Sequence, residues 1–298
     1  MEWDLEAFTR EKRTMLITLY GKALDNRKPK PLLGDHFADD AVRLLKLDAR
    51  QLKFPEGGEI SLPIRAKQLD GWTKDFIAAH PTAVVLHLGC GLDSRVFRVD
   101  PSADVLWFDV DQEPVIELRR RVYPQRPGYE LLATDATSLA WLERAPKGRP
   151  VLVVAEGFTM YLTPSSGPAL FRRIVEAFPS GELIFDAYSQ FMVKMMTLNP
   201  ALRAAGTRLT WGFGDLHALE RDVPGLNLVD SIPFLAMPEL VEEMGTTPYR
   251  RTMLGFMARR RWYQNLVRHV RYRFASEGGE PRANARCGKT SWESASSS

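Results

Sequence analysis

Apolar runs of four to seven residues recur along the middle of the chain, and segments with helical periodicity separate them. The runs occupy residues 83–88, 104–110, 129–132, 150–155 and 182–186. Strands that are apolar on both faces are typical of parallel sheets buried between helices, whereas half-exposed antiparallel strands alternate. The pattern therefore predicts an α/β, Rossmann-like fold, with a mostly parallel sheet and helices on both of its faces.

The chain before the first run has a helical pattern. An apolar stretch at residues 14–24 is followed by a proline-containing break at residues 26–31, and a second helical piece spans residues 35–47. Residues 61–80 predict one amphipathic helix, which Pro81 ends. The apolar face of this helix consists of Ile64, Leu69, Trp72, Phe76 and Ile77.

After the fifth run the pattern becomes mixed. Residues 188–222 are rich in Met and aromatic residues, and they predict a helical lid over a substrate. A sixth strand is expected at residues 226–232, a helix at residues 238–244, and a seventh, edge strand at residues 270–274, where apolar and polar residues alternate.

These elements predict one domain over residues 1–275. We divide it into an N-terminal helical part (1–80), a ligand-binding core (81–187), the lid (188–222) and the C-terminal strands and helix (223–275). Residues 276–298 are rich in Ser, Gly, Glu and Arg. Such a composition cannot bury enough apolar surface to order itself, so we expect a disordered tail.

Composition limits the partners and the compartment. The 298-residue chain carries a net charge of +3, too small to indicate nucleic-acid binding. It has two cysteines, no apolar leader at its start and no apolar run long enough to span a membrane. We therefore expect a cytoplasmic protein, monomer or homodimer, that contacts neither nucleic acid nor membrane and needs no metal.

The segment 244–276 contains eight arginines, one histidine and no acid, with aromatic residues between them. One interpretation is a surface for nucleic acid or acidic lipid. The other is a basic helix followed by an edge strand whose arginines prevent pairing with another chain. The small net charge of the whole chain favours the second interpretation.

A glycine-rich turn follows the first apolar run. Gly89 and Gly91 form a G-x-G pattern, and glycine there lets the backbone turn tightly and approach a ligand. The third glycine of a dinucleotide-binding motif is replaced by Ser94. This replacement disfavours a dinucleotide and favours a ligand without a pyrophosphate.

Acidic residues follow three consecutive runs: Asp111, Asp135 and Glu156. Because parallel strands end at the same edge of a sheet, these acids are expected on one rim, where they suit a ligand with hydroxyls, an amino group and a positive centre. Asp111 lies about 20 residues past the G-x-G, the offset of a ribose-binding acid. An N-cap for the following helix is the alternative for Asp111.

Arg65 lies with Asp70 on the helix that precedes the first run. Its guanidinium could reach the rim and bind a ligand carboxylate. A solvated helix face is the alternative, and without further context the residue type alone favours it.

Several motifs in order resemble the leucine carboxyl methyltransferase-like family. They are Arg65 with Asp70, HLGCGLDSRVFR at residues 87–98, FDVD at 108–111, TD at 134–135, EGFTMYL at 156–162, residues 178–186 and the opening at 14–38. The opening is similar to that of the polyketide O-methyltransferase branch, the tetracenomycin carboxyl methylase-like enzymes. The resemblance implies a seven-stranded class I methyltransferase fold with S-adenosyl-L-methionine as cofactor.

The resemblance also implies roles at the methionine end of the cofactor. Arg65 would bind the methionine carboxylate, and Glu156 would face the amino group. Gly89 and Gly91 would let the backbone pass close to this part of the molecule. An acidic rim agrees with these roles, because the cofactor carries an ammonium and a sulfonium.

At the nucleoside end, the resemblance assigns Asp111 to the ribose hydroxyls. Asp135 would hydrogen bond to the adenine amine, with Ala136 beside it. On the acceptor side, Tyr161 is our candidate for a substrate-facing residue. Tyr188, His36 and His217 are the other candidates for a general base, and we choose none of the four.

The predicted activity is methyl transfer to a carboxyl or hydroxyl of a small molecule, such as a polyketide-like secondary metabolite. Methyl transfer from a sulfonium is an in-line displacement, in which the enzyme aligns the acceptor and excludes water. A protein C-terminal carboxyl methyltransferase is one alternative. A catalytically silent, cofactor-binding regulator is another, although such a protein would not need these acids or Arg65.

Overall fold

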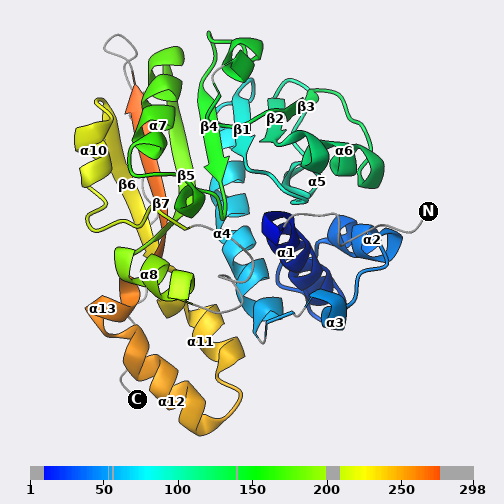
Figure 1. Cartoon of the computed structure of the whole chain (residues 1–298), viewed down its shortest axis with the longest axis vertical. Coiled ribbons are helices and arrows are strands. Elements are labelled where there is room, and N and C mark those ends of the chain that lie inside the picture. Colours follow the sequence, from blue (N-terminus) through cyan, green and yellow to red (C-terminus); the bar gives the residue numbers. More distant parts are fainter. Residues whose placement is uncertain (1–9, 53, 56, 139, 199–208, 276–298) are drawn as a thin grey trace, which may run out of the picture.

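Within the described residues, seven strands form one sheet in the order β3-β2-β1-β4-β5-β7-β6 (Figure 1). The computed structural model describes residues 10–275 except 53, 56, 139 and 199–208, so the predicted tail lies outside the described residues. The strands are β1 (Val84–Leu88), β2 (Leu106–Asp111), β3 (Tyr129–Ala133), β4 (Val151–Ala155), β5 (Ser180–Tyr188), β6 (Leu226–Pro233) and β7 (Val267–Ala275).

Strands β1 to β5 are parallel and carry helices on both faces. Val84 and Leu86 of β1 share one core with α7 (Ser166–Ala177), whereas Val85 shares the other with α4 (Gly58–Ala79). Every residue of β1 and β4 is buried, which explains why these runs are apolar throughout. The predicted fold class is confirmed.

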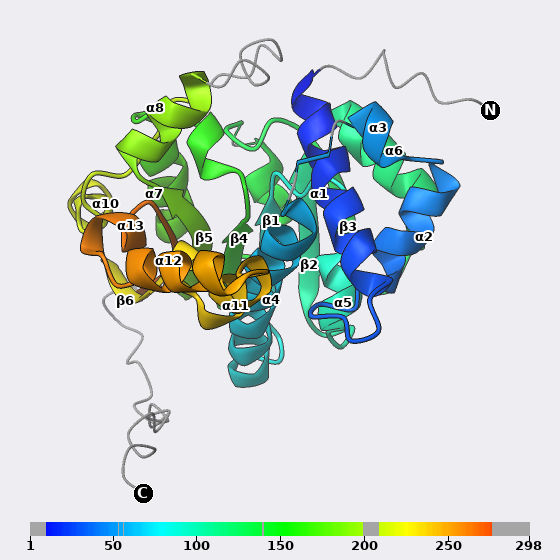
Figure 2. The ribbon, with the colours of Figure 1, turned by 90° about the horizontal axis from the view of Figure 1, so that it is seen from below.

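The N-terminal helices pack together beside the parallel part of the sheet (Figure 2). They are α1 (Arg10–Asn26), α2 (His36–Leu44) and α3 (Ala49–Leu52). Their apolar residues form one cluster with Leu92, after β1, and with Leu118 of α6 (Glu113–Val122). This packing places α1 over the end of β1, where Gly91 approaches Met15 of the helix.

The prediction that residues 270–274 form an edge strand is wrong, because they belong to β7, an internal strand. It pairs antiparallel with β5 on one side and with β6 on the other, so β6 is the edge. The arginines of β7 do not protect an edge: Arg271 and Arg273 bind the buried carboxylate of Glu182 on β5 at 2.6 and 2.8 Å. Alternation of apolar and polar residues indicates which face of a strand is buried, but it does not indicate how many strands pair with it.

The predicted lid contains α8 (Gln190–Leu198) and α10 (Ala218–Asp222). The described segment between them, residues 209–217, is not helical. There, Trp211 and Phe213 join the main core instead of covering it, and Phe213 bridges to Ser189 after β5. Residues 199–208 of the predicted lid lie outside the described residues.

The remaining described helices are short. They are α5 (Arg95–Val99), α11 (Pro238–Met244), α12 (Pro248–Ala258), α13 (Arg261–Gln264) and the 3-10 helices η1 (Ala140–Arg144), η2 (Thr159–Tyr161) and η3 (Phe234–Ala236). Among all helices that the structure describes, none has the length and apolar character needed to cross a membrane.

Candidate active site

A cavity of about 660 Å³ lies at the carboxyl ends of β1, β2 and β4. Figure 2 views this end of the molecule, with α1 and α8 on either side. The structure brings all eight predicted site residues to this cavity. They are Arg65, Gly89, Gly91, Asp111, Asp135, Ala136, Glu156 and Tyr161.

The backbone conformation of the turn after β1 requires glycine at two positions. Gly89 and Gly91 have φ values of +60° and +51°, a region that favours glycine. A Cβ atom at Gly89 would also lie 2.4 Å from Cδ2 of Phe158. The turn therefore brings the backbone to the cavity at a point where a side chain does not fit.

Asp111, at the end of β2, is held by two backbone amides. Its Oδ2 accepts a hydrogen bond from Gly91 N and its Oδ1 from Gln112 N, both at 2.8 Å. The N-cap alternative is wrong, because the N-cap residue of α6 is Gln112. Burial raises the pKa of Asp111 above its usual value, while the two amide bonds oppose the rise.

Arg65 extends from α4 into the cavity and is not on a solvated helix face, as the alternative had it. Its side chain is 11% exposed. Nε donates to Oε1 of Glu156 at 3.1 Å, and Nη1 donates to Oδ2 of Asp186 at 3.3 Å and to the Tyr188 hydroxyl at 3.4 Å. The guanidinium is therefore fixed between two acids and a phenol at the rim.

Glu156, directly after β4, lies among three cations. Besides Arg65, its carboxylate contacts Lys22 of α1 at 3.4 Å and Arg95 of α5 through a short hydrogen bond. Burial alone would raise the pKa of this carboxyl, but Lys22, Arg65 and Arg95 hold it well below its usual range. Glu156 is therefore ionised, and it fixes the cations around it.

Asp135 and Ala136 follow β3 on the open side of the cavity. The Asp135 side chain is exposed, and its Oδ1 accepts a hydrogen bond from Thr137 N at 2.8 Å. Ala136 is buried beside it. This wall therefore combines an accessible carboxylate with a small apolar side chain.

The cavity continues into an apolar region, which we call the acceptor wall. Its residues come from α4, η2, β5, α8 and the segment before Thr210, and they are Leu62, Met160, Tyr161, Tyr188, Met196 and Leu209. Neither His36 nor His217 lines the cavity. The His36 ring lies tilted against the Phe37 ring, and His217 pairs with Glu220 at 2.8 Å on the surface. Those two base candidates are thus excluded by position.

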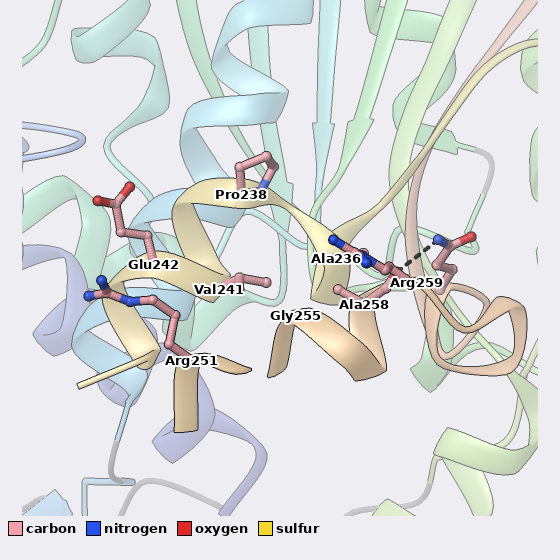
Figure 3. A pocket seen from close by; sticks show the side chains of 9 residues that line it. Ala236, Pro238, Val241, Glu242, Arg251, Gly255, Ala258 and Arg259 are labelled. Carbon is pink, nitrogen blue, oxygen red and sulfur yellow. Dashed lines mark hydrogen bonds between the residues drawn. The ribbon is translucent and has the colours of Figure 1, made fainter. Parts of the chain in front are cut away.

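A second hollow, of about 450 Å³, lies between η3, α11 and α12 (Figure 3). Its lining includes Glu242, Arg251 and Arg259, and it shares no residue with the first cavity. The predicted site residues therefore meet in the first cavity alone.

Comparisons with known proteins identify the family of the chain. The sequence model of the family described as leucine carboxyl methyltransferase matches residues 15–175, more than half of the chain. The chain belongs to the leucine carboxyl methyltransferase family. Membership confirms the prediction of an S-adenosyl-L-methionine-dependent methyltransferase.

Two curated relatives of this family member cover most of its length. The tetracenomycin polyketide synthesis O-methyltransferase TcmP of Streptomyces glaucescens is 43% identical over 236 residues, which are 77% of this chain and 87% of TcmP. The S-adenosyl-L-methionine-dependent methyltransferase dpfgK of Gibberella zeae is 35% identical over 243 residues, 73% of this chain and 80% of dpfgK.

Among solved structures, a DUF574 family protein from Streptomyces avermitilis aligns with a TM-score of 0.55. The alignment covers 88% of this chain and 97% of that protein, at 13% sequence identity. At this identity the likeness concerns the fold alone.

Sequence reasoning missed three charged residues of this leucine carboxyl methyltransferase family member. Lys22 lies 3.2 Å from Asp93, and Arg95 donates to Asp70 at 2.6 Å as well as to Glu156. Asp93 and Arg95 were part of the recognised motif, but a motif does not show which way a side chain points. Lys22 lies in the opening that resembles the family, but its place at the rim could not be predicted, because only folding brings α1 there.

A second layer of buried charge supports the glycine turn. Arg119 of α6 donates to the carbonyl oxygens of Gly91 and Asp93 at 2.9 and 2.8 Å and also contacts Asp109. Asp109 in turn lies 2.9 Å from Nδ1 of His87. These bonds hold the glycine turn in place.

Proposed function

We propose that the chain is an O-methyltransferase that methylates a carboxyl or hydroxyl of a polyketide-like small molecule, with S-adenosyl-L-methionine as methyl donor. The observation that carries this proposal is the cavity, in which a charged rim lies directly beside the apolar acceptor wall. The relative TcmP, a tetracenomycin polyketide synthesis O-methyltransferase, supports the class of acceptor.

The residues at the rim fit the cofactor chemically. Arg65 would bind the methionine carboxylate, with Glu156 beside the amino group, and Gly89 and Gly91 leave room for this part. At the rim, the cofactor supplies a methyl group on a positively charged sulfur. Arg65 is fixed before binding by Glu156 and Asp186, so little side-chain entropy is lost when the cofactor binds.

At the nucleoside end, Asp111 would accept hydrogen bonds from the ribose hydroxyls and Asp135 from the adenine amine, beside Ala136. The two backbone amides that hold Asp111 keep its carboxylate in place at the cavity. A carboxylate oxygen has room for more than one hydrogen bond, so these amides do not prevent ribose binding.

A carboxylate is the acceptor that this chain supports best. It is ionised at pH 7 and needs no general base, whereas a phenol with a pKa near 10 benefits from one. On the described part of the acceptor wall, Tyr161 and Tyr188 are the titratable side chains. Burial raises the pKa of Tyr188 far above its usual value, so its phenol does not act as a base at neutral pH.

In this mechanism the protein positions the reactants. A cofactor held by Arg65, Asp111 and Glu156 would supply the methyl group, and the chain would place the acceptor oxygen for an in-line displacement. The acceptor wall, with Met196 and Leu209, holds the acceptor and keeps water away from the reacting atoms. Tyr161 faces this space.

Two experiments test the proposal. Calorimetric titration of S-adenosyl-L-methionine should show binding by the wild type and at least a tenfold weaker binding by Asp111→Ala, because loss of a charged hydrogen bond costs about 1.5–3 kcal/mol. Glu117→Ala, on the next helix and outside the cavity lining, is the matched control. Equal binding by wild type and Asp111→Ala would remove Asp111 from the site.

The second experiment identifies the acceptor. The wild type is incubated with tritiated methyl donor and a panel of aromatic carboxylic acids, aromatic phenols or peptides with a free C-terminus. Transfer to the aromatic compounds supports the proposal. Transfer to peptides alone would indicate the protein C-terminal methyltransferase, and binding without any transfer would indicate the silent regulator. A cytoplasmic location and the choice between monomer and homodimer stay predictions.

A further inference from the structure

The Tyr188 side chain lies where the charged rim meets the acceptor wall. It ends β5 and lines the cavity, and its ring packs on the apolar cluster of Met160, Val193 and Leu209. On its other side, the hydroxyl oxygen lies 3.4 Å from Nη1 of Arg65. Tyr188 therefore contacts the rim through its oxygen and the acceptor wall through its ring.

The hydrogen bond with Arg65 decides whether the Tyr188 hydroxyl donates or accepts in its other contacts. Arg65 is always a donor, so the Tyr188 oxygen is the acceptor in this contact. The proton of the same hydroxyl is then left for a second group. A hydroxyl polarised by a neighbouring cation is a stronger donor than an isolated one.

The chemistry of the neighbours makes Tyr188 a donor and not a base. Asp186, two residues before it, accepts hydrogen bonds from Arg65 Nη1 and from Gly157 N. Burial and the negative charge of Asp186 both favour the neutral phenol, and they outweigh the opposing effect of Arg65 on the pKa of Tyr188. The residue therefore keeps its proton throughout the neutral range.

We propose that the Tyr188 hydroxyl forms a subsite for an acceptor carboxylate and donates a hydrogen bond to its non-attacking oxygen. The ring directs the apolar body of the acceptor toward Met196 and Leu209. The other carboxylate oxygen is then free to form the C–O bond to the methyl group as the C–S bond breaks. The product is a methyl ester, and the positive charge of the sulfonium is neutralised.

A neutral donor suits this task better than a direct ion pair. The charge of Arg65 is already opposed by Glu156 and Asp186, which lie 3.1 and 3.3 Å from it. A hydrogen bond from a phenol fixes the orientation of the carboxylate without placing a full positive charge against the nucleophile. The subsite thus selects acids over amides or esters of the same shape, because the ionised oxygen is the stronger acceptor.

The test compares wild type with Tyr188→Phe, which removes one oxygen atom. The probes are anthraquinone-2-carboxylic acid and 2-naphthoic acid, with tritiated S-adenosyl-L-methionine as donor. We expect the KM for the acid to rise about tenfold or more in the variant, with a smaller change in kcat. The Kd for S-adenosyl-L-methionine should change less than twofold, which a general loss of structure would not allow.

Tyr249→Phe is the matched control, because it makes the same change at a side chain that is 78% exposed and outside the cavity. A KM unchanged in Tyr188→Phe would overturn the subsite while leaving the proposed function intact. A weakened Kd for the cofactor with an unchanged KM for the acid would also overturn it, since Tyr188 would then serve the cofactor. A wild type that methylates phenols but neither methylates nor binds any acid would overturn the subsite alone. A wild type that methylates neither acids nor phenols would overturn both proposals.

A pH profile of the wild type tests the same point if Tyr188→Phe does not fold. With a donor at position 188 and an ionised acid as acceptor, kcat/KM should stay constant between pH 7 and 9. A rise of kcat/KM across this range would show that a base drives the reaction, and it would overturn the subsite.

Discussion

The guanidinium of Arg65 meets the carboxylate of Glu156 at 3.1 Å, although 91 positions separate them in the sequence. One residue lies on a helix that precedes the sheet, and the other directly follows its fourth strand. The pair is almost fully buried, with side-chain exposures of 11% and 4%. It joins the N-terminal helices to the rim of the sheet, so changes to it affect both stability and ligand binding.

Replacement of Glu156 by Ala should be strongly destabilising. It would leave Lys22, Arg65 and Arg95 without their shared carboxylate, and an unbalanced buried charge costs about 3–5 kcal/mol. Urea unfolding measures the loss. Glu130→Ala is the control, because it removes an exposed pair with Arg144 and should cost about 1 kcal/mol or less. Similar losses in both variants would contradict a buried network.

Replacement of Gly89 by Ala should disrupt the turn in two ways. The positive φ disfavours any L side chain by about 1–2 kcal/mol, and the new methyl group would collide with Phe158. Gly225→Ala separates these effects, since Gly225 has a φ of +84° and open space around it. We expect a larger loss of unfolding free energy at Gly89 than at Gly225.

A double variant tests the steric part of the Gly89 effect. Phe158→Ala combined with Gly89→Ala removes the ring atoms that the new methyl group would meet at 2.4 Å. Part of the stability lost in Gly89→Ala should therefore return in the double variant, after correction for Phe158→Ala alone. Strictly additive losses would show that no collision occurs.

His269 of β7 should make the protein sensitive to acid. Neither ring nitrogen has a hydrogen-bond partner among the described residues, and burial lowers the pKa of His269 to about 3. In the unfolded chain the same group has a pKa near 6.5. The unfolded state thus binds the proton first, and stability falls as the pH drops from about 6.5 toward 3, by up to about 1.4 kcal/mol per pH unit.

His269→Phe should remove this dependence. At pH 7 the variant should also be more stable by about 1–2 kcal/mol, because an aromatic ring replaces unsatisfied buried nitrogens beside Phe234. Urea unfolding of wild type and variant from pH 4 to 7 gives both quantities. The same slope in both proteins would mean that other groups cause the acid sensitivity. The surface variant His217→Phe controls for the change of residue type.

Replacement of Arg119 by Lys should loosen the glycine turn without removing the buried charge. A lysine cannot span the carbonyls of Gly91 and Asp93 and the Asp109 carboxylate at once. We expect a several-fold increase in the Kd for S-adenosyl-L-methionine, measured by calorimetry. An unchanged Kd would show that the turn keeps its shape without this clamp.

The sequence was sufficient for those features that local physics decides. A strand that is apolar on both faces, such as residues 150–155, is stable only when both faces are buried. The sequence therefore predicted a parallel sheet that lies between helices. Parallel strands end at one rim, so residues directly after them, such as Asp111 and Glu156, had to be neighbours. Gly89 had to be glycine because of a turn within a few residues of it.

Only the tertiary structure decided which distant groups meet. Lys22 reaches Glu156 because α1 packs over the end of β1, and no local pattern carries that information. Arg65 could have faced water, and Asp111 could have capped a helix, since the same residue types serve both purposes. Strand β7 became internal because β6 pairs with it from a distant segment. Side-chain direction and strand neighbours depend on packing between elements, whereas periodicity and turn chemistry depend on adjacent residues alone.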